Sequence, residues 1–264
     1  MKKFRESLFN FETFDIKLDT EFIGRNFIYS EEVESTNSFL LNNAEKLDVN
    51  GTVLLAEKQT RGKGRNNSIW HSNKEQNLTF SILLTDKKYF EKFFNIINFA
   101  TSLAVSQAIE NIYQLRTELK WPNDILINHK KVAGILLESS SKGSKISKLV
   151  IGIGVNVNQT LFQGNFNIAP TSLKNELSFN VEREKTLAEI LNIFESNIEK
   201  SLTKPDDILK DWKLKCRMIG EIISISADGH VKDGIFVDLD NEGFLLLKTR
   251  DKIEKIHFGE VSLL

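Results

Sequence analysis

Hydrophobic and polar positions along the chain follow two different periods, which together predict a sheet covered by helices. Residues 52–57 have the character of a strand, and within 77–85 every second residue from Leu78 to Leu84 is apolar. Residues 91–113 instead repeat apolar side chains at helical spacing, with no Gly or Pro between them. This long amphipathic helix is expected to cover one face of the sheet.

The next part of the chain continues the sheet. Four β-like stretches follow, interrupted by Pro122, by the turn 128–130 and by an expected loop at 139–148; they are 118–121, 125–128, 132–139 and 149–158. A shorter helix is expected to begin near residues 35–38, where Ser, Thr and Asn favour N-capping. A second long helix is predicted over 184–203. The pattern favours a mixed or antiparallel sheet.

Beyond Pro205, which we interpret as a boundary, the pattern changes to short strands. Asp228-Gly229, Asp233-Gly234 and 241–243 are each typical of a turn between strands. About fifty residues of this kind predict a small β-barrel that resembles SH3 domains. We therefore expect a larger mixed-sheet domain at 1–208 and a barrel at 209–264.

Composition narrows the function classes. The chain has 264 residues, 41% of them hydrophobic, which is enough for a packed core and excludes a disordered protein. Thirty-five basic residues against 36 acidic ones give a net charge of -1, which offers no overall attraction to DNA or to a membrane surface. The single cysteine, Cys216, and the absence of metal-ligand spacing predict a reducing, cytoplasmic location. No apolar run approaches the ~18 residues of a membrane helix.

The most unusual stretch is 57–65, in which four cations accompany two glycines. Gly62 and Gly64 allow backbone N–H groups to approach an anion closely, and the Lys and Arg side chains supply charge. The stretch therefore fits a phosphate-binding loop. On composition alone, a solvated basic hairpin is the better explanation, because charged loops that contain glycine are common; Gln59 and Trp70 beside the cations only weaken it.

The stretch 120–124 carries a second group of polar residues. Pro122 forces Trp121 into an extended conformation, so that Asn123 and Asp124 present oxygen atoms beside a strand. Lys131 follows at the start of an apolar strand. It is either a snorkelling edge residue or, if the hairpin returns past Asp124, a member of the same site.

The stretch 151–158 contains two glycines but matches neither of the common nucleotide-binding motifs. Gly152 and Gly154 form a G-x-G, but the third position of a dinucleotide fingerprint is Val157, and no Walker motif occurs. The two glycines fit either a ligand lying flat on the sheet or close backbone packing.

Taken in order, these stretches resemble the biotin protein ligases of the monofunctional type, which lack an N-terminal DNA-binding domain. The matching stretches are 34–37, 57–70, 120–124, 131–138, 152–156 and 259–263. The resemblance implies an α/β (α+β) fold: a mixed-sheet catalytic domain like that of class II synthetase-like biotin/lipoate ligases, followed by a C-terminal SH3-like β-barrel. It also implies biotin, ATP and Mg²⁺, and a two-step reaction through biotinyl-adenylate on a biotin carboxyl carrier domain.

The resemblance also implies roles for individual residues. Expected biotin-binding residues are Ser35, Thr36, Asn37, Gln59, Gly62, Lys63, Lys131, Gly134, Gly152 and Gly154. Expected ATP-binding residues are Arg65, Trp70, Lys120, Asn123, Lys131 and Asn156. Lys131, Arg65 and Asp124 are expected to be catalytic, with Asp124 near the magnesium ion.

Two positions depart from the family pattern, and other functions compete. Asn67 stands where a glycine is expected, and Leu264 stands where the family often has an arginine. The alternatives are a lipoate or other acyl-adenylating ligase, a nucleic-acid-binding module using 58–65, and a biotin-responsive repressor. Fewer than about thirty residues precede the match, too few for a DNA-binding domain of the usual ~50 or more. The oligomeric state stays open, a homodimer included.

Overall fold

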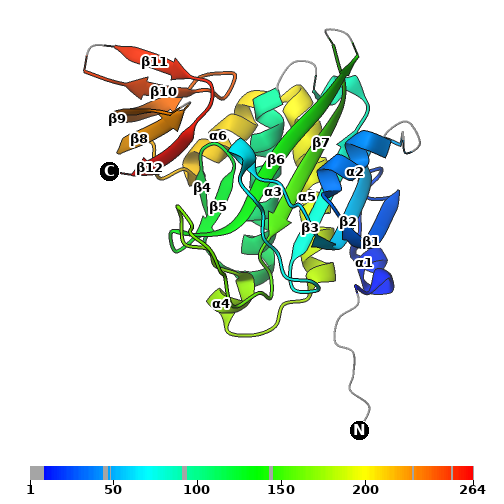
Figure 1. Ribbon diagram of the computed structural model, residues 1–264. Coiled ribbons are helices and arrows are strands. Elements are labelled where there is room, and N and C mark those ends of the chain that lie inside the picture. Colours follow the sequence, from blue (N-terminus) through cyan, green and yellow to red (C-terminus); the bar gives the residue numbers. More distant parts are fainter. Residues whose placement is uncertain are drawn as a thin grey trace.

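The computed structural model describes residues 9–43, 47, 49–90, 94–142, 145–227, 229–250 and 252–263 (Figure 1). Its helices are α1 (Phe11–Lys17), α2 (Thr36–Asn43), α3 (Phe94–Tyr113), α4 (Leu173–Leu177), α5 (Arg183–Thr203) and α6 (Pro205–Lys215), with short 3₁₀ turns η1 (Arg65–Asn67) and η2 (Lys87–Tyr89). Its strands are β1 (Phe27–Val33), β2 (Thr52–Gln59), β3 (Leu78–Leu84), β4 (Glu118–Lys120), β5 (Asp124–Ile127), β6 (Lys130–Lys142), β7 (Lys145–Val155), β8 (Ile222–Ala227), β9 (His230–Leu239), β10 (Leu245–Lys248), β11 (Ile253–Ile256) and β12 (Glu260–Leu263).

The larger part is a seven-stranded mixed sheet with strand order β1-β2-β3-β7-β6-β5-β4. β1 and β2 are parallel, and the other neighbours are antiparallel. The predicted strands are confirmed. β1 was not predicted, because Ser30, Glu31 and Glu32 break its apolar pattern at the edge of the sheet.

Helices cover the two faces of this sheet unequally. The long helices α3 and α5 lie side by side on one face, over a core that contains Phe80, Ile82 and Phe99 (Figure 1). The short helix α2 lies on the opposite face, where Leu40 packs with Leu83. The predicted long helices are confirmed, although 91–93, the expected first turn of α3, fall outside the described residues. Most of the α2 face is left open, and this is where the cleft lies.

The loop expected at 139–148 is largely strand, which corrects the prediction. β6 and β7 extend the hairpin with Ser140 opposite Lys148 and Lys142 opposite Lys145, and 143–144 lie outside the described residues. Ser and Lys side chains suggested a loop, but the ladder needs only backbone donors and acceptors. The hairpin therefore projects beyond the neighbouring strands (Figure 1).

The change of architecture comes after α6, not at Pro205. Pro205 occupies the first turn of α6, where its missing N–H costs nothing, and the helix runs through 208–209. Trp212 of this helix is buried: its ring lies 4.7 Å from that of Phe99, and its indole N–H donates to the Ser102 hydroxyl at 3.1 Å. The helix therefore packs with the first part of the chain.

The C-terminal part is a five-stranded antiparallel sheet with order β11-β10-β9-β8-β12. The predicted turn at 241–243 is confirmed, with Gly243 at φ +82°. The turn predicted at Asp233-Gly234 is wrong, because both residues lie inside β9 and pair with Ser224 and Ile223. Gly234 instead permits close packing, since a Cβ there would lie 2.7 Å from the Lys248 carbonyl oxygen. Asp228, expected in another turn, lies outside the described residues.

Two hydrogen bonds attach the C-terminal sheet beside the cleft. The Trp121 indole N–H donates to the Gly243 carbonyl at 3.3 Å, and the Asn95 amide donates to the Glu242 carbonyl at 2.9 Å. The β9–β10 turn is thereby held against the start of α3 and the segment before β5. Among the described helices, none is both long and apolar enough to cross a bilayer.

Candidate active site

A cleft of about 1120 Å³ opens on the α2 face of the large sheet. Every predicted site residue except Gly62 lines it: Ser35, Thr36, Asn37, Gln59, Lys63, Arg65, Trp70, Lys120, Asn123, Asp124, Lys131, Gly134, Gly152, Gly154 and Asn156. Gly62 lines a neighbouring cavity of about 720 Å³ that shares Lys63, Gly64 and Arg65 of the loop with the cleft. The sequence stretches that looked separate therefore meet at one place.

One end of the cleft is a polar pocket at the start of α2. The side-chain oxygen of Gln59 accepts from the Thr36 backbone N–H at 2.7 Å and from the Thr36 hydroxyl at 3.0 Å. Ser35, Thr36 and Asn37 are all buried. Gly62 packs closely beside this pair, because a Cβ on Gly62 would lie 3.0 Å from the Gln59 side-chain nitrogen and 2.3 Å from the Trp70 carbonyl oxygen. The pocket therefore presents fixed donors and acceptors in a desolvated place.

Two residues that were not predicted complete this pocket. The Asn37 amide donates to the Glu138 carboxylate at 2.9 Å, and its oxygen accepts from the Ser81 hydroxyl at 2.6 Å. A Cβ on Gly152 would lie 2.4 Å from that oxygen, so the glycine makes room for Asn37. Ser81 could have been predicted from its place in the strand pattern, because it is a polar residue between the apolar positions of a buried strand. Glu138 gave only the polar end of an apolar run.

The middle of the cleft has a flat floor occupied by an aromatic ring. A Cβ on Gly154 would lie 2.3 Å from Cε2 of Trp70, and one on Gly134 would lie 3.3 Å from its Cζ3. The glycines therefore admit a ring flat against the sheet. The Trp70 indole N–H is buried and has no hydrogen-bond partner among the described residues. A buried, unpaired donor favours a ligand with an acceptor there.

Cations gather beside this floor. Lys131 lies within 2.6 Å of Asp124, so the hairpin does return past Asp124. The Arg65 guanidinium donates to the Asn123 side-chain oxygen at 3.4 Å and to the Gly259 carbonyl at 3.2 Å. Burial lowers the pKa of Lys120, while the Asp124 carboxylate opposes the shift. Burial likewise lowers the pKa of Arg65. Desolvated cations of this kind are ready to bind an anion.

The chain brings Lys131 to Asp124 through a tight turn. Asn128 and His129 both have positive φ, 50° and 61°, and join β5 to β6 as a two-residue hairpin. The backbone of Lys131 is also tied to the 169–171 segment, through Lys131 N–H to Ala169 O at 2.8 Å and Thr171 N–H to Lys131 O at 2.9 Å. Asn156 supports the same segment by donating to the Thr171 carbonyl at 3.0 Å.

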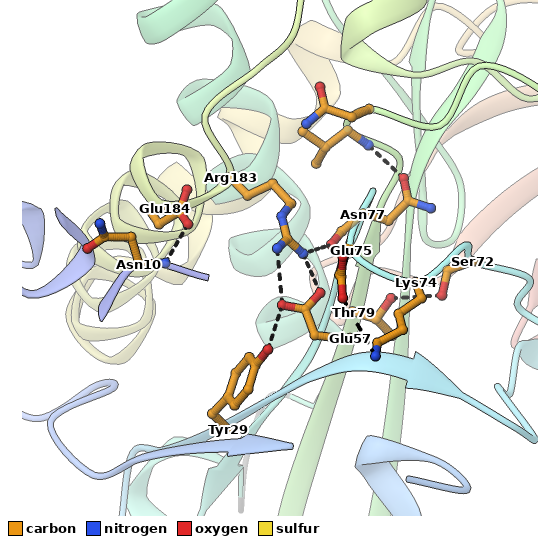
Figure 2. A network of polar contacts seen from close by, with 12 residues as sticks. Asn10, Tyr29, Glu57, Ser72, Lys74, Glu75, Asn77, Thr79, Arg183 and Glu184 are labelled. Atoms are coloured by element: carbon orange, nitrogen blue, oxygen red, sulfur yellow. Dashed lines mark hydrogen bonds and ion pairs between the residues drawn. The ribbon is translucent and has the colours of Figure 1, made fainter. Parts of the chain in front are cut away.

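A buried ion pair anchors the strand that leads into the loop (Figure 2). Figure 2 shows Arg183 reaching from the start of α5 to Glu57 of β2, with N–O distances of 2.6 and 3.0 Å. The same guanidinium donates to the Asn77 carbonyl at 3.1 Å, and the Tyr29 hydroxyl donates to Glu57 at 3.1 Å. Burial, with the Glu57 carboxylate second, raises the pKa of Tyr29. Gln59 thus follows a rigid point of the sheet.

The cations of the basic loop are paired or turned inward, which disfavours a nucleic-acid site. Lys63 is paired with Glu138, Arg61 with Glu34 and Lys58 with Glu32. Arg65, the fourth cation, turns into the cleft. Paired or inward charges leave few contacts for a phosphate backbone.

Of the two positions that differ from the family pattern, Asn67 and Leu264, the structure explains the first. The left-handed residue of the loop is Asn66, at φ +51°, so a glycine at position 67 is not needed for the turn. Leu264 lies outside the described residues.

Comparisons with known proteins agree with this geometry. Residues 29–156 match the biotin/lipoate A/B protein ligase family, and residues 218–264 match the biotin protein ligase C terminal domain. The bifunctional ligase/repressor BirA of Bacillus subtilis is 32% identical over 251 residues, covering 93% of this chain and 76% of that protein. The chain belongs to the biotin protein ligase family.

Other relatives of this ligase support the assignment over most of the chain. The biotin–[acetyl-CoA-carboxylase] ligase of Mycobacterium tuberculosis is 27% identical, covering 86% of this chain and 85% of that one. The biotin protein ligase of Aquifex aeolicus in complex with biotin and ATP superimposes with a TM-score of 0.79 at 32% identity, covering 91% of this chain and 99% of that chain. The expected combination of a mixed-sheet catalytic part and a C-terminal antiparallel β part is confirmed.

The ligase offers a limited donor set for a metal ion. Among the described residues, no cluster of three or more His, Cys, Asp or Glu side chains could hold a metal ion. Asp124 is one carboxylate, already paired with Lys131, and the Asn123 amide oxygen, which accepts from Arg65, lines the same cleft. This set does not fit an all-protein metal cage, but it fits Mg²⁺ that is held mainly by the phosphates of a nucleotide.

Proposed function

We propose that this ligase joins biotin to a lysine of a carrier protein, through biotinyl-5′-adenylate, with a biotin carboxyl carrier domain as the acceptor. The observation that carries the proposal is that one cleft is lined by three features: a polar pocket, glycines that admit an aromatic ring, and a group of partly or largely buried cations. A bicyclic ureido compound with a carboxylate tail matches these features, since its ring system needs donors and acceptors and its tail needs cations. We also propose a cytoplasmic location.

In the first step, the biotin carboxylate oxygen attacks the α-phosphorus of ATP, and the bond from that phosphorus to pyrophosphate breaks. Lys131 stands where charge develops between the two anions, held by Asp124. Arg65 reaches the same place from the loop and is fixed by Asn123 and Gly259. Lys120 adds a third cation. Mg²⁺, carried on the phosphates near Asp124, would neutralise further charge on the nucleotide.

In the second step, the lysine amine of the carrier attacks the acyl carbon, AMP leaves, and the new amide loses one proton. Arg65 and Lys131 retain the phosphate of the intermediate until the amine arrives. Trp70 lies against Gly134 and Gly154 in the cleft, and the adenine would lie beside Asn156, which lines the same cleft. The amide nitrogen of Asn156 already donates to Thr171, so its oxygen is the atom available to the nucleotide.

A test of this proposal separates biotin from lipoate. The protein is incubated with ATP and magnesium together with either acid, and the acyl-adenylate is sought by mass spectrometry. We expect the adenylate with biotin, followed by labelling of one lysine of a biotin carboxyl carrier domain. Adenylate formation with lipoate and none with biotin would overturn the proposal in favour of a lipoate ligase.

A further inference from the structure

Glu138 connects the basic loop to the polar pocket through its two carboxylate oxygens. One oxygen lies 3.2 Å from the Lys63 ammonium of the loop, and the other accepts from the Asn37 amide at 2.9 Å. The residue belongs to β6, where its backbone is opposite Val150. Loop and pocket thus share one anionic side chain.

The orientation of the Asn37 amide depends on this carboxylate. Its nitrogen faces two acceptors, Glu138 and the Leu136 carbonyl at 3.2 Å, and its oxygen faces the Ser81 hydroxyl. The opposite orientation would place the amide oxygen against both acceptors and its N–H groups against the hydroxyl. An anion at position 138 therefore fixes which side of Asn37 donates.

The fixed amide then orders the rest of the pocket. The Ser81 hydroxyl lies 2.6 Å from the Asn37 oxygen and 2.7 Å from the Thr36 hydroxyl, and Thr36 contacts Gln59. A continuous series of polar contacts therefore runs from Lys63 through Glu138 and Asn37 to Gln59. All its links beyond Glu138 are buried or half-buried, so each is little weakened by water.

We propose that Glu138 is a positioning residue, a latch that holds the 61–69 loop closed through Lys63 and at the same time sets the donor side of Asn37 in the biotin pocket. The inference rests on the proposed function for the identity of the ligand. Pocket and loop are coupled because one carboxylate serves both. Loss of its charge releases Lys63 and frees the Asn37 amide to turn.

A merely structural role is distinguishable, because the Glu138 side chain is 27% exposed and outside the core clusters. Glu138→Gln keeps the volume but removes the charge that holds Lys63, and its amide can present either an oxygen or a nitrogen to Asn37, so it no longer fixes the Asn37 orientation. Glu138→Leu removes both contacts. Glu32→Gln is the matched control, since it breaks the Lys58 ion pair beside the same loop without touching the cleft.

The experiment uses the full chain and two readouts. Trypsin cleavage within the loop, at Arg61, Lys63 and Arg65, is measured without ligand and with biotin, and biotin affinity is measured by calorimetry. We expect Glu138→Gln to speed loop cleavage without ligand by roughly two- to fivefold, as for a partly exposed ion pair. We expect the same change to raise the biotin Kd roughly tenfold, as for loss of a charge-assisted contact. Glu138→Leu has the larger effect on Kd, and Glu32→Gln has none. Lys63→Met combined with Glu138→Gln weakens biotin no further than the worse single change.

Three results would overturn the latch: wild-type loop cleavage in Glu138→Gln, an unchanged biotin Kd in that variant, or fully additive effects in the double variant. A wild-type protein that does not bind biotin overturns the proposed function instead. The cleavage comparison without ligand still decides whether Glu138 holds the loop in that case.

Discussion

Lys131 Nζ lies 2.6 Å from Asp124 Oδ1, across the hairpin that joins β5 to β6. The contact fixes a long, flexible side chain in the cleft, where we propose that the carboxylate and the α-phosphate meet. A cation held in advance pays no reorganisation cost when charge develops.

Lys131→Ala is therefore expected to slow biotinyl-adenylate formation at least ~100-fold, because a positioned cation at developing phosphate charge contributes about 2.7–4 kcal/mol. Single-turnover formation of the adenylate is the measurement. Lys130→Ala, which changes the neighbouring exposed residue, is the control. Near-normal adenylate formation in Lys131→Ala would remove this residue from the mechanism.

Arg65→Gly is expected to impair retention of the adenylate more than its synthesis, because its contact to the phosphate persists after the bond is made. Escaped adenylate would label lysines on bystander proteins, detectable with a streptavidin blot. Arg61→Gly, on the exposed side of the same loop, should leave labelling confined to the carrier. Bystander labelling equal to that of the wild type would contradict the role of Arg65.

Gly154→Ala is expected to lower the rate of adenylate formation roughly tenfold or more, while the melting temperature of the protein stays nearly unchanged. The added methyl group would overlap the Trp70 ring at 2.3 Å and push it off the floor, whereas the strand backbone at position 154 tolerates alanine. Trp70→Leu in the same protein should reduce the cost of the alanine, because the overlap disappears. An equal cost with either residue at position 70 would exclude the steric explanation.

Arg183→Met is expected to lower the free energy of unfolding by about 3–5 kcal/mol, because it leaves the Glu57 carboxylate buried without its partner. Urea denaturation measures the loss. Glu57→Leu together with Arg183→Met should be less destabilised than Arg183→Met alone, since no uncompensated charge remains. A double variant that loses at least as much as the single one would refute this account.

The Cys216 thiol is expected to react slowly with iodoacetamide in the folded protein. Burial raises its pKa to about 11, and the thiolate is the reactive form. At pH 8 alkylation should be at least roughly tenfold slower than in urea, and the difference should shrink as the pH approaches 11. Because the pKa of this thiol is higher in the folded protein than in the unfolded chain, the thiol contributes to the stability of the fold up to about pH 8.5. That contribution is lost as the pH rises through 11. Equal rates at pH 8 with and without urea would show an accessible thiol.

The elements that could be predicted from the sequence are those with a strong local period. The patterns of residues 77–85 and 184–203 predict a strand and a helix. Burial of one face requires an apolar side chain at every second position of a strand and at every third to fourth position of a helix. The hairpin of β6 and β7 extends through Ser and Lys residues whose pairing depends on backbone contacts alone. Asp233-Gly234 has the composition of a turn, yet both residues lie within β9. The glycine there allows the backbone to pack closely against β10.

Site residues could likewise be predicted only where the local sequence is distinctive. Predicted residues lie in short stretches with unusual composition, such as Lys120–Asp124. Ser81 and Glu138 act on Asn37 across 44 and 101 residues of sequence, and neither stands out in its own strand. Only the packing of β3 and β6 beside β7 brings the three together.

The three tryptophans of the chain differ in a way that has practical value. The indole N–H groups of Trp121 and Trp212 are bonded inside the protein, to Gly243 and Ser102. Trp70 has a buried N–H without a partner and lies in the cleft itself. A change in intrinsic fluorescence on adding substrate should therefore come mainly from Trp70. The enzyme would carry its own optical probe, and ligand entry could be timed by stopped flow without attaching a dye.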